Sequence, residues 1–333
     1  MINTVIEKIN SLLTKANFET FVLGNFATSK CKLCFDILVK KNDEVFSVKI
    51  FPNIDNINPA IIQDIKSFSL ILKSKPLLIG IRNRYQKLED NTIYIRSGLP
   101  IITYNTFEKI LTNNVFPHIL ARRGGGVIFM NGNLMKKVRE EHSITRKELS
   151  EKLGVAKRTV CAYENESMRP SEEMAEKILD ILENNGILKK INIFKWNIKY
   201  DIIEKDLSEQ KELNEFETHI KTIIDDIGLS SYWYKKGSIP FKLSLFSRQN
   251  QAEDDGFYPL FSNISEDQHN INELNFNSLK IFNDLFHKTA LYIIDNNIKI
   301  PETTKRNDIH IVKIKNLEEV NDEEEFIELI QDS

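Results

Sequence analysis

The chain has 333 residues, which is enough for two or three domains with a sizeable hydrophobic core. Hydrophobic residues make up 41% and charged residues 28%, with only 12 glycines and 9 prolines, so the composition excludes disordered, collagen-like and low-complexity proteins. The 45 Lys and Arg residues nearly balance the 48 Asp and Glu residues, and a net charge of −3 excludes a protein that binds polyanions over its whole surface. Any nucleic-acid-binding surface must therefore be local.

The sequence lacks the signals of secretion and of membrane insertion, and this indicates its cellular compartment. The N-terminal segment MINTVIEKIN has no basic region leading into an apolar stretch, and no uncharged apolar run is long enough to span a bilayer. Three cysteines, an odd number, argue against a disulfide framework. We therefore expect a cytoplasmic protein that does not associate with a membrane.

The first part of the chain alternates helical and strand patterns. The expected elements are a helix over about 1–30, strands at 33–40 and 45–51, a helix after Pro59, strands at 76–80, 92–96 and 100–103, and a helix at 106–111. Such alternation predicts an α/β domain over residues 1–120.

The middle of the chain differs from the first part in its composition and in its hydrophobic pattern. Residues 112–127 contain a proline and three consecutive glycines, a pattern typical of a linker or an exposed connector. From 131 to 186 every apolar period is helical, and the segment 122–170 has 11 Lys and Arg residues against 6 Asp and Glu residues. We expect a basic, helical domain over 121–190. The run of three glycines lacks the motifs of a nucleotide-binding loop, so we predict no cofactor.

The last part, 191–333, returns to strands and helices and resembles the first part in the order of its elements. Residues 35–40 (FDILVK) can be aligned with 241–246 (FKLSLF), and residues 48–54 with 258–264. The order of elements agrees better than the residues do. A duplicated α/β domain and two separate α/β domains both remain open.

The helical segment contains the most specific local signals. Thr145 and Glu148 have the spacing of a capping box, in which each side chain caps the backbone of the other residue. The helix that they begin ends at Gly154, a residue suited to the left-handed conformation that follows a helix. A third helix starts two residues later, and this arrangement is a helix-turn-helix, whose second helix enters the DNA major groove.

The third helix of this segment predicts which side chains face DNA. Val160 and Tyr163 have the spacing of core residues, so the outward-facing residues are Lys157, Arg158, Cys161 and Ala162. The two cations occupy the N-terminal turn, the part of a recognition helix that reaches base edges. Double-stranded DNA is the predicted partner.

The string REEHSITRKELSEKLGV at 139–155, continued by Thr159-Val160 and Tyr163-Glu164-Asn165, resembles the lambda-repressor-like (XRE) helix-turn-helix family over about 55 residues. The resemblance implies a structural ion pair between Arg139 and Glu164. It implies a phosphate contact for Arg146, and base contacts for Lys157, Arg158, Thr159 and Ala162.

Three positions depart from the family pattern. Ser150 replaces the usual alanine of the second helix, Ser143 replaces the usual glycine of the first turn, and Ala156 replaces the usual Ser or Thr that caps the recognition helix. These changes weaken the caps without removing the motif.

The first α/β domain contains Asp36 and Lys49 on successive predicted strands, the spacing at which restriction-endonuclease-like folds place Asp and (Asp/Glu)-x-Lys. Such nucleases use two carboxylates to hold a divalent cation. The second carboxylate is replaced here by Ser47, so we interpret Asp36 and Lys49 as vestigial and predict neither a metal site nor an enzyme.

Two further observations bear on that interpretation. In the second copy, Lys242 and Pro259 stand where Asp36 and Lys49 would be. A missing ligand could still come from Glu7, Glu19 or Asp55, which keeps a nuclease as an alternative.

The whole arrangement resembles the archaeal putative HTH-type transcriptional regulatory proteins. The matching segments are CFDILVKKNDEVFSVKI, PLLIG, SGLPIITYNTFEKIL, the RGGG segment, the helix-turn-helix, IPFKL and the acidic C-terminal segment.

We therefore expect two restriction-endonuclease-like α/β domains flanking a lambda-repressor-like domain of four to five helices, and a transcriptional regulator that binds specific DNA sequences. We expect a homodimer, since one such module reads a single half-site, and contact with the transcription machinery. The alternatives are a metal-dependent DNA nuclease targeted by the helix-turn-helix, and a protein-interaction scaffold whose helix-turn-helix is silent.

Overall fold

The computed structural model describes residues 2–22, 34–42, 44–71, 74–122, 125–196, 213–234, 241–248, 258, 260–265, 276, 279–280, 282–283, 289–298 and 309–331. The chain divides into two compact units: Met1–Asn17 with Lys49–Ile57 and Leu77–Ile198, and Phe18–Val48 with Asn58–Pro76 and Lys199–Ser333. Across the described residues, no helix is long and apolar enough to cross a membrane.

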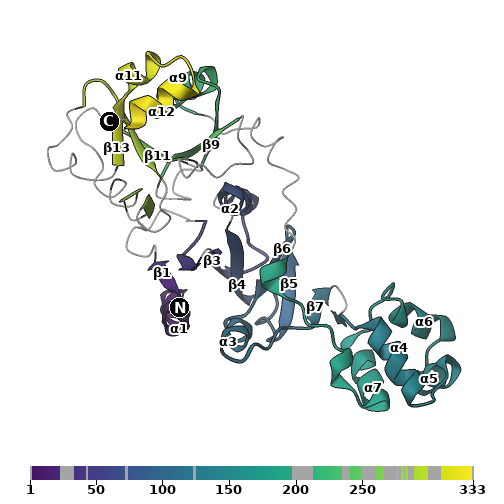
Figure 1. Ribbon diagram of the computed structural model, residues 1–333. Coiled ribbons are helices and arrows are strands. Elements are labelled where there is room, and N and C mark those ends of the chain that lie inside the picture. Colours follow the sequence, from purple (N-terminus) through teal and green to yellow (C-terminus); the bar gives the residue numbers. More distant parts are fainter. Residues whose placement is uncertain are drawn as a thin grey trace. The chain divides into compact units, whose positions relative to one another are not determined.

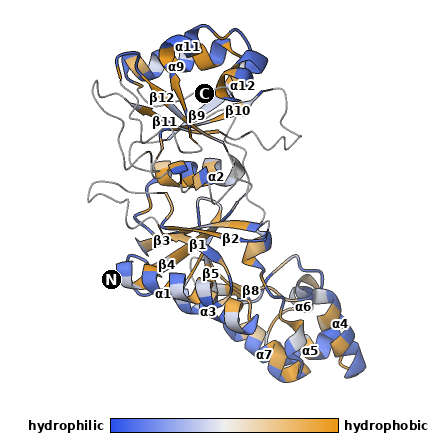
Figure 2. Cartoon of the chain, turned by 60° about the vertical axis from the view of Figure 1, so that its left-hand side comes forward, coloured by the Kyte–Doolittle hydropathy of each residue, from blue (hydrophilic) through white to orange (hydrophobic). Residues whose placement is uncertain are grey.

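The first sheet has eight strands in the order β1-β2-β3-β4-β6-β5-β7-β8. Its elements are α1 (Ile2–Lys15), β1 (Glu19–Val22), β2 (Ile37–Lys41), β3 (Glu44–Asn53), α2 (Pro59–Ile71), β4 (Lys75–Arg82), β5 (Thr92–Arg96), β6 (Leu99–Ile102), α3 (Tyr104–Asn113), β7 (Ile119–Arg122) and β8 (Gly125–Ile128) (Figure 1). Figure 2 shows that the strands are largely hydrophobic. Most side chains of β2, β4 and β6 are buried and belong to the hydrophobic core.

Two predictions for this region are wrong. The first helix ends at Lys15 rather than near residue 30, because Asn17 takes a left-handed conformation (φ 60°) and β1 then pairs with β2. The predicted connector at 112–127 contains β7 and β8, which pair as an antiparallel hairpin, and β7 also pairs with β5. Arg123 and Gly124 lie outside the described residues.

The helical module follows the hairpin directly. It consists of α4 (Gly132–Glu141), α5 (Arg146–Leu153), α6 (Lys157–Glu164), α7 (Glu172–Leu182) and the 3-10 helix η2 (Asn185–Ile187). Its core contains Leu149, Val160 and Ile178, and it extends to Ile119 and Ile128 of the hairpin. A second 3-10 helix, η3 (Ile193–Lys195), ends the segment, and its neighbour Trp196 donates from Nε1 to the carbonyl of Gly98.

The second sheet has five strands in the order β13-β12-β11-β10-β9. Its elements are α9 (Glu215–Asp226), β9 (Leu229–Trp233), β10 (Leu243–Ser247), β11 (Leu260–Ser265), β12 (Ala290–Ile294), β13 (Ile309–Lys313), α11 (Ile314–Glu318) and α12 (Glu323–Gln331). The apolar faces of α9, α11 and α12 pack on this sheet in one core.

The two sheets share an order of strands. In the first, β1/β2 and β2/β3 are antiparallel and β4/β6 are parallel; in the second, β9/β10 and β10/β11 are antiparallel and β12/β13 are parallel. The aligned segments 35–40 and 241–246 contribute to the corresponding strands β2 and β10. A duplicated domain stays a prediction. The fold combines α/β layers with an all-helical module.

Candidate nucleic-acid interface

Helix α5 is fixed at both ends by local interactions. The Thr145 hydroxyl accepts from the Glu148 backbone N–H at 3.2 Å, and the Glu148 carboxylate accepts from the Thr145 N–H at 2.7 Å. These bonds lower the pKa of Glu148. At the other end Gly154 has φ 67°, and its N–H donates to the carbonyl of Glu151. The predicted capping box and glycine stop therefore set the length of α5 and the start of the turn into α6.

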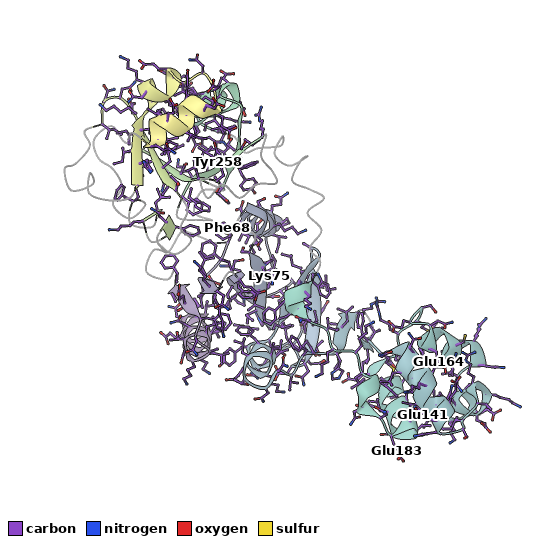
Figure 3. All side chains as sticks on the ribbon, viewed as in Figure 1. Phe68, Lys75, Glu141, Glu164, Glu183 and Tyr258 are labelled. Atoms are coloured by element: carbon purple, nitrogen blue, oxygen red, sulfur yellow. The ribbon has the colours of Figure 1, made fainter. Side chains whose placement is uncertain are left out.

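A buried carboxylate links three helices of the module. The side chain of Glu164, at the end of α6, is 1% exposed and lies among the helices in Figure 3. One of its oxygens accepts from Arg139 Nε of α4 at 2.6 Å, and the other accepts from Arg146 Nε of α5 at 2.7 Å. Arg139 also donates to the carbonyl of Ile144 at 2.7 Å. The structure thus brings together Arg139 and Glu164, and it adds Arg146 to them.

The position of Arg146 differs from a freely solvated surface arginine. Its side chain is 34% exposed, and the hydrogen bond to Glu164 raises its pKa. The Arg146 guanidinium is held at the start of α5 by Glu164, while about a third of the side chain stays exposed. The bond from Arg146 to Glu164 was not predicted from the sequence, because it depends on how α5 packs against α6.

Helix α6 presents the predicted outer face. Lys157 and Arg158 are exposed in the first turn, whereas Val160 and Tyr163 are 0% and 7% exposed. The remaining predicted residues, Thr159, Cys161 and Ala162, are half-buried along the same helix. Ala156 precedes the helix with extended backbone angles and makes no side-chain cap, as its methyl group requires.

A close contact between α4 and α6 was not predicted from the sequence. A Cβ atom on Gly132 would lie 2.1 Å from the backbone oxygen of Glu164, so only glycine fits there. The Gly132 N–H donates to Glu166, whose other carboxylate oxygen accepts from Lys189 Nζ at 2.9 Å. The hydrogen bond from Lys189 lowers the pKa of Glu166. A glycine at the first position of a helix was the signal available in the sequence.

The candidate metal ligands of the first domain do not form a divalent-cation site. Asp36 precedes β2 and donates its backbone N–H to the carbonyl of Val48, the residue before Lys49 on β3. Ser47 is 3% exposed, and its hydroxyl has no hydrogen-bond partner among the described residues. A serine at this buried position cannot supply the second carboxylate that a hard cation requires.

The other carboxylates do not supply the missing ligand. Glu7 and Glu19 are exposed on α1 and β1, and both oxygens of Asp55 are bonded, to the Arg84 N–H and the Arg96 side chain. Among the residues that the structure describes, no group of three or more His, Cys, Asp or Glu side chains could hold a metal ion. The residues present do not fit the cation of a restriction-endonuclease-like site.

The C-terminal segment has different chemistry at the position aligned with Asp36. Lys242 Nζ at this position donates to Glu217 of α9 at 2.8 Å. Pro259 lies outside the described residues.

Comparison with protein families identifies two domains. Residues 2–117 match the PD-(D/E)XK superfamily domain, and residues 135–184 match a helix-turn-helix family. The first match agrees with the restriction-endonuclease-like domain that the sequence predicts, and the second runs from within α4 past the end of α7. No solved structure matches the chain significantly.

Several archaeal proteins are similar to the chain. A protein of Archaeoglobus fulgidus named "Putative HTH-type transcriptional regulatory protein" is 29% identical over 80% of each chain. A protein of the same name from Methanococcus vannielii is 29% identical over 92% of this chain and 93% of its own, and one from Methanobrevibacter smithii is 32% identical over 60% and 61%. The chain therefore contains a lambda-repressor-like helix-turn-helix domain and a PD-(D/E)XK superfamily domain, and along most of its length it is similar to these archaeal proteins.

Proposed function

We propose that the protein is a transcriptional regulator that binds specific sequences of double-stranded DNA, with α6 in the major groove. The observation that carries the proposal is the two-sided character of α6. Its inner face is anchored by Val160, Tyr163 and the buried Glu164, while Lys157 and Arg158 project from its first turn. A recognition helix needs this combination, because base contacts require side chains that are exposed on a backbone that cannot shift.

We infer separate roles for the exposed residues. Lys157 and Arg158 are long enough to donate to guanine O6 and N7, the commonest specific contact in the major groove. Farther along the helix lie the shorter side chains of Thr159, Cys161 and Ala162. They contact only those bases or thymine methyl groups that lie close to the helix. Arg146 contacts a phosphate with the part of its guanidinium that Glu164 does not bind.

The proposed regulator acts as a homodimer in the cytoplasm. One helix-turn-helix covers a single half-site, and two half-sites one helical turn apart give the affinity that regulation requires. The α/β domains would supply the dimer surface, an effector site or a contact with the transcription machinery.

The experiment that tests the proposal is selection from a random duplex pool followed by a salt titration on the enriched site. The variant Lys157→Ala/Arg158→Ala should weaken binding to that site by roughly 1–3 kcal/mol for each lost base contact and should relax the preference at those positions. The control Lys177→Ala/Lys195→Ala removes the same charge from α7 and η3 and should retain the preference. An unchanged motif in the α6 variant would remove Lys157 and Arg158 from the reading surface.

The match to the PD-(D/E)XK superfamily supports a second candidate, a metal-dependent nuclease targeted by the helix-turn-helix. We propose that the domain is not catalytic, because Ser47 replaces the second carboxylate beside Asp36 and Lys49. Incubation of a duplex containing the enriched site with Mg²⁺ or Mn²⁺ should leave it intact, and cleavage would favour the nuclease. If no duplex binds in a salt-sensitive manner, the helix-turn-helix is silent and the protein is an interaction scaffold.

A further inference from the structure

The loop between β4 and β5 carries a cluster of cations around a protruding tyrosine. Arg82, Arg84 and Lys87 are all exposed, and Tyr85 at the tip of the loop is 87% exposed. The next most exposed large hydrophobic residue among those described, Met168, is 50% exposed. An aromatic ring held almost entirely in solvent contributes little to the core and is accessible to a ligand.

The backbone of this loop is tightly constrained. Arg82 and Lys87 form an antiparallel bridge, and the Asn83 N–H donates to the carbonyl of Gln86 at 2.9 Å. The side-chain oxygen of Asn83 accepts from the backbone N–H groups of Tyr85 and Gln86 at 2.8 and 2.7 Å. The tip therefore displays its side chains from a fixed turn, which reduces the entropy lost on binding.

A neighbouring carboxylate anchors the loop through its backbone. Asp55 accepts from the Arg84 backbone N–H at 2.9 Å and from the Arg96 guanidinium, and these bonds lower its pKa. The negative charge of Asp55 is paired with Arg96, and it also attracts Arg84 at longer range. The side-chain nitrogens of Arg82, Arg84 and Lys87 form no hydrogen bond or ion pair with the other residues that the structure describes.

We propose that this loop, residues 82–87, binds the phosphate backbone of double-stranded DNA as a contact separate from α6. Arg, Lys and Tyr side chains are the usual partners of DNA phosphate oxygens. A single tyrosine is not the series of stacking rings on which single-stranded DNA is bound, so the loop favours a duplex. The inference rests on the proposed function only in the choice of DNA as ligand, because it does not require α6 to read bases.

The salt dependence of binding to a duplex of random sequence measures the contact. The variant Arg84→Gln/Lys87→Gln keeps the Arg84 N–H bond to Asp55 and removes two charges. We expect the plot of log K against log salt to become shallower by about 2, since each phosphate contact contributes about 0.9 to the slope. The matched control Lys8→Gln/Lys15→Gln removes two exposed cations from α1 and should keep the slope.

A second variant separates charge from the aromatic contact. Tyr85→Ala should weaken binding about two- to tenfold through the loss of one hydrogen bond and its ring contacts, with no change of slope. Equal affinity of this variant and the wild type would remove Tyr85 from the contact.

The outcomes distinguish the loop from the proposed function. If the enriched site is bound with sequence preference but Arg84→Gln/Lys87→Gln has the wild-type slope, the loop contact is overturned and α6 stands. If no sequence preference is found but the loop variant is shallower than its control, the loop contact stands and the proposed function fails. If the wild type binds no duplex, both are overturned.

Discussion

Replacing Arg139 with alanine tests whether the buried charge cluster holds the helix-turn-helix together. Arg139 is 6% exposed on its side chain, and it donates to Glu164 at 2.6 Å and to the carbonyl of Ile144 at 2.7 Å. The substitution removes these two donors and a third that bonds the exposed Glu140 at 3.2 Å, and it leaves Glu164, 1% exposed, with Arg146 alone. It also leaves the Ile144 carbonyl without its charged partner.

The magnitude follows from the cost of an incompletely paired buried charge. Removal of one partner of a buried ion pair destabilises proteins by about 3–5 kcal/mol, mostly because the remaining charge stays out of water. Glu164 retains the bond from Arg146 at 2.7 Å, so we expect a value near the lower limit, about 3 kcal/mol. At about 1.4 kcal/mol per factor of ten, this is roughly a hundredfold change in the population of the locally unfolded state.

Amide hydrogen exchange of α5 and α6 is the suitable assay, because a chain with several domains does not unfold in one step. We expect exchange in these helices to accelerate about a hundredfold in Arg139→Ala. Lys137→Ala on the same helix is the control, since Lys137 is 72% exposed and its 3.7 Å pair with Glu141 contributes less than about 1 kcal/mol. Equal exchange rates in the two variants would refute a structural role for the buried cluster.

The glycine, the turn and the missing cap of the same module lead to three further predictions, each measured as the free energy of unfolding of the module by hydrogen exchange. Ala156→Ser should stabilise α6 by about 0.5–2 kcal/mol, because its hydroxyl can accept from the Thr159 N–H; no gain would contradict the capping argument. Gly132→Ala should destabilise by about 3 kcal/mol, since its Cβ would lie 2.1 Å from a backbone oxygen of Glu164, and wild-type stability would contradict the close approach. Ser143→Gly should raise the free energy of unfolding by about 0.5–1 kcal/mol, because Ser143 has a left-handed φ of 57° and the relief of that strain exceeds the added entropy of the unfolded chain. A lower free energy of unfolding would show that the strain is small.

The parts of the fold that could be predicted from the sequence are those set by neighbouring residues. The capping box of Thr145 and Glu148 and the left-handed Gly154 depend on residues at most three positions apart, and all are present. The buried face of α6 follows from the spacing of Val160 and Tyr163 in the same way. Local rules of this kind identified the helix-turn-helix and its outward-facing cations.

The parts that could not be predicted depend on contacts between distant segments. The hairpin of β7 and β8 contains glycines and follows a proline, and it becomes part of the sheet only because β7 pairs with β5, more than twenty residues earlier. The bond from Arg146 to Glu164 likewise depends on the packing of α5 on α6. Periodicity and turn signals contain no information about such pairings.

The same hairpin determines how the helix-turn-helix is attached. The segments that enter and leave the module are joined by backbone hydrogen bonds, from Asn131 to Ile187 at 2.8 Å and from Lys189 to Phe129 at 2.7 Å. Beyond them, Ile191 donates to Pro117 at 2.8 Å. A ladder of this kind, with a core shared between helices and hairpin, differs from the linker or exposed connector that the sequence predicted.

This attachment has a consequence for the proposed dimer. If each module is fixed to its own sheet, the surface that joins two chains also fixes the separation and rotation of the two α6 helices. We therefore expect the enriched operator to tolerate little change in half-site spacing, and insertion of 5 base pairs, about half a turn of the duplex, to reduce affinity to that of a single half-site. The measurement is titration of operators whose half-sites are separated by spacers of graded length. Insertion of a full turn of about 10 base pairs is the control, because it keeps the rotation between the half-sites and changes only their separation. Equal affinity at every spacing would show that the modules move independently of the sheets, and would contradict the attachment through β7 and β8.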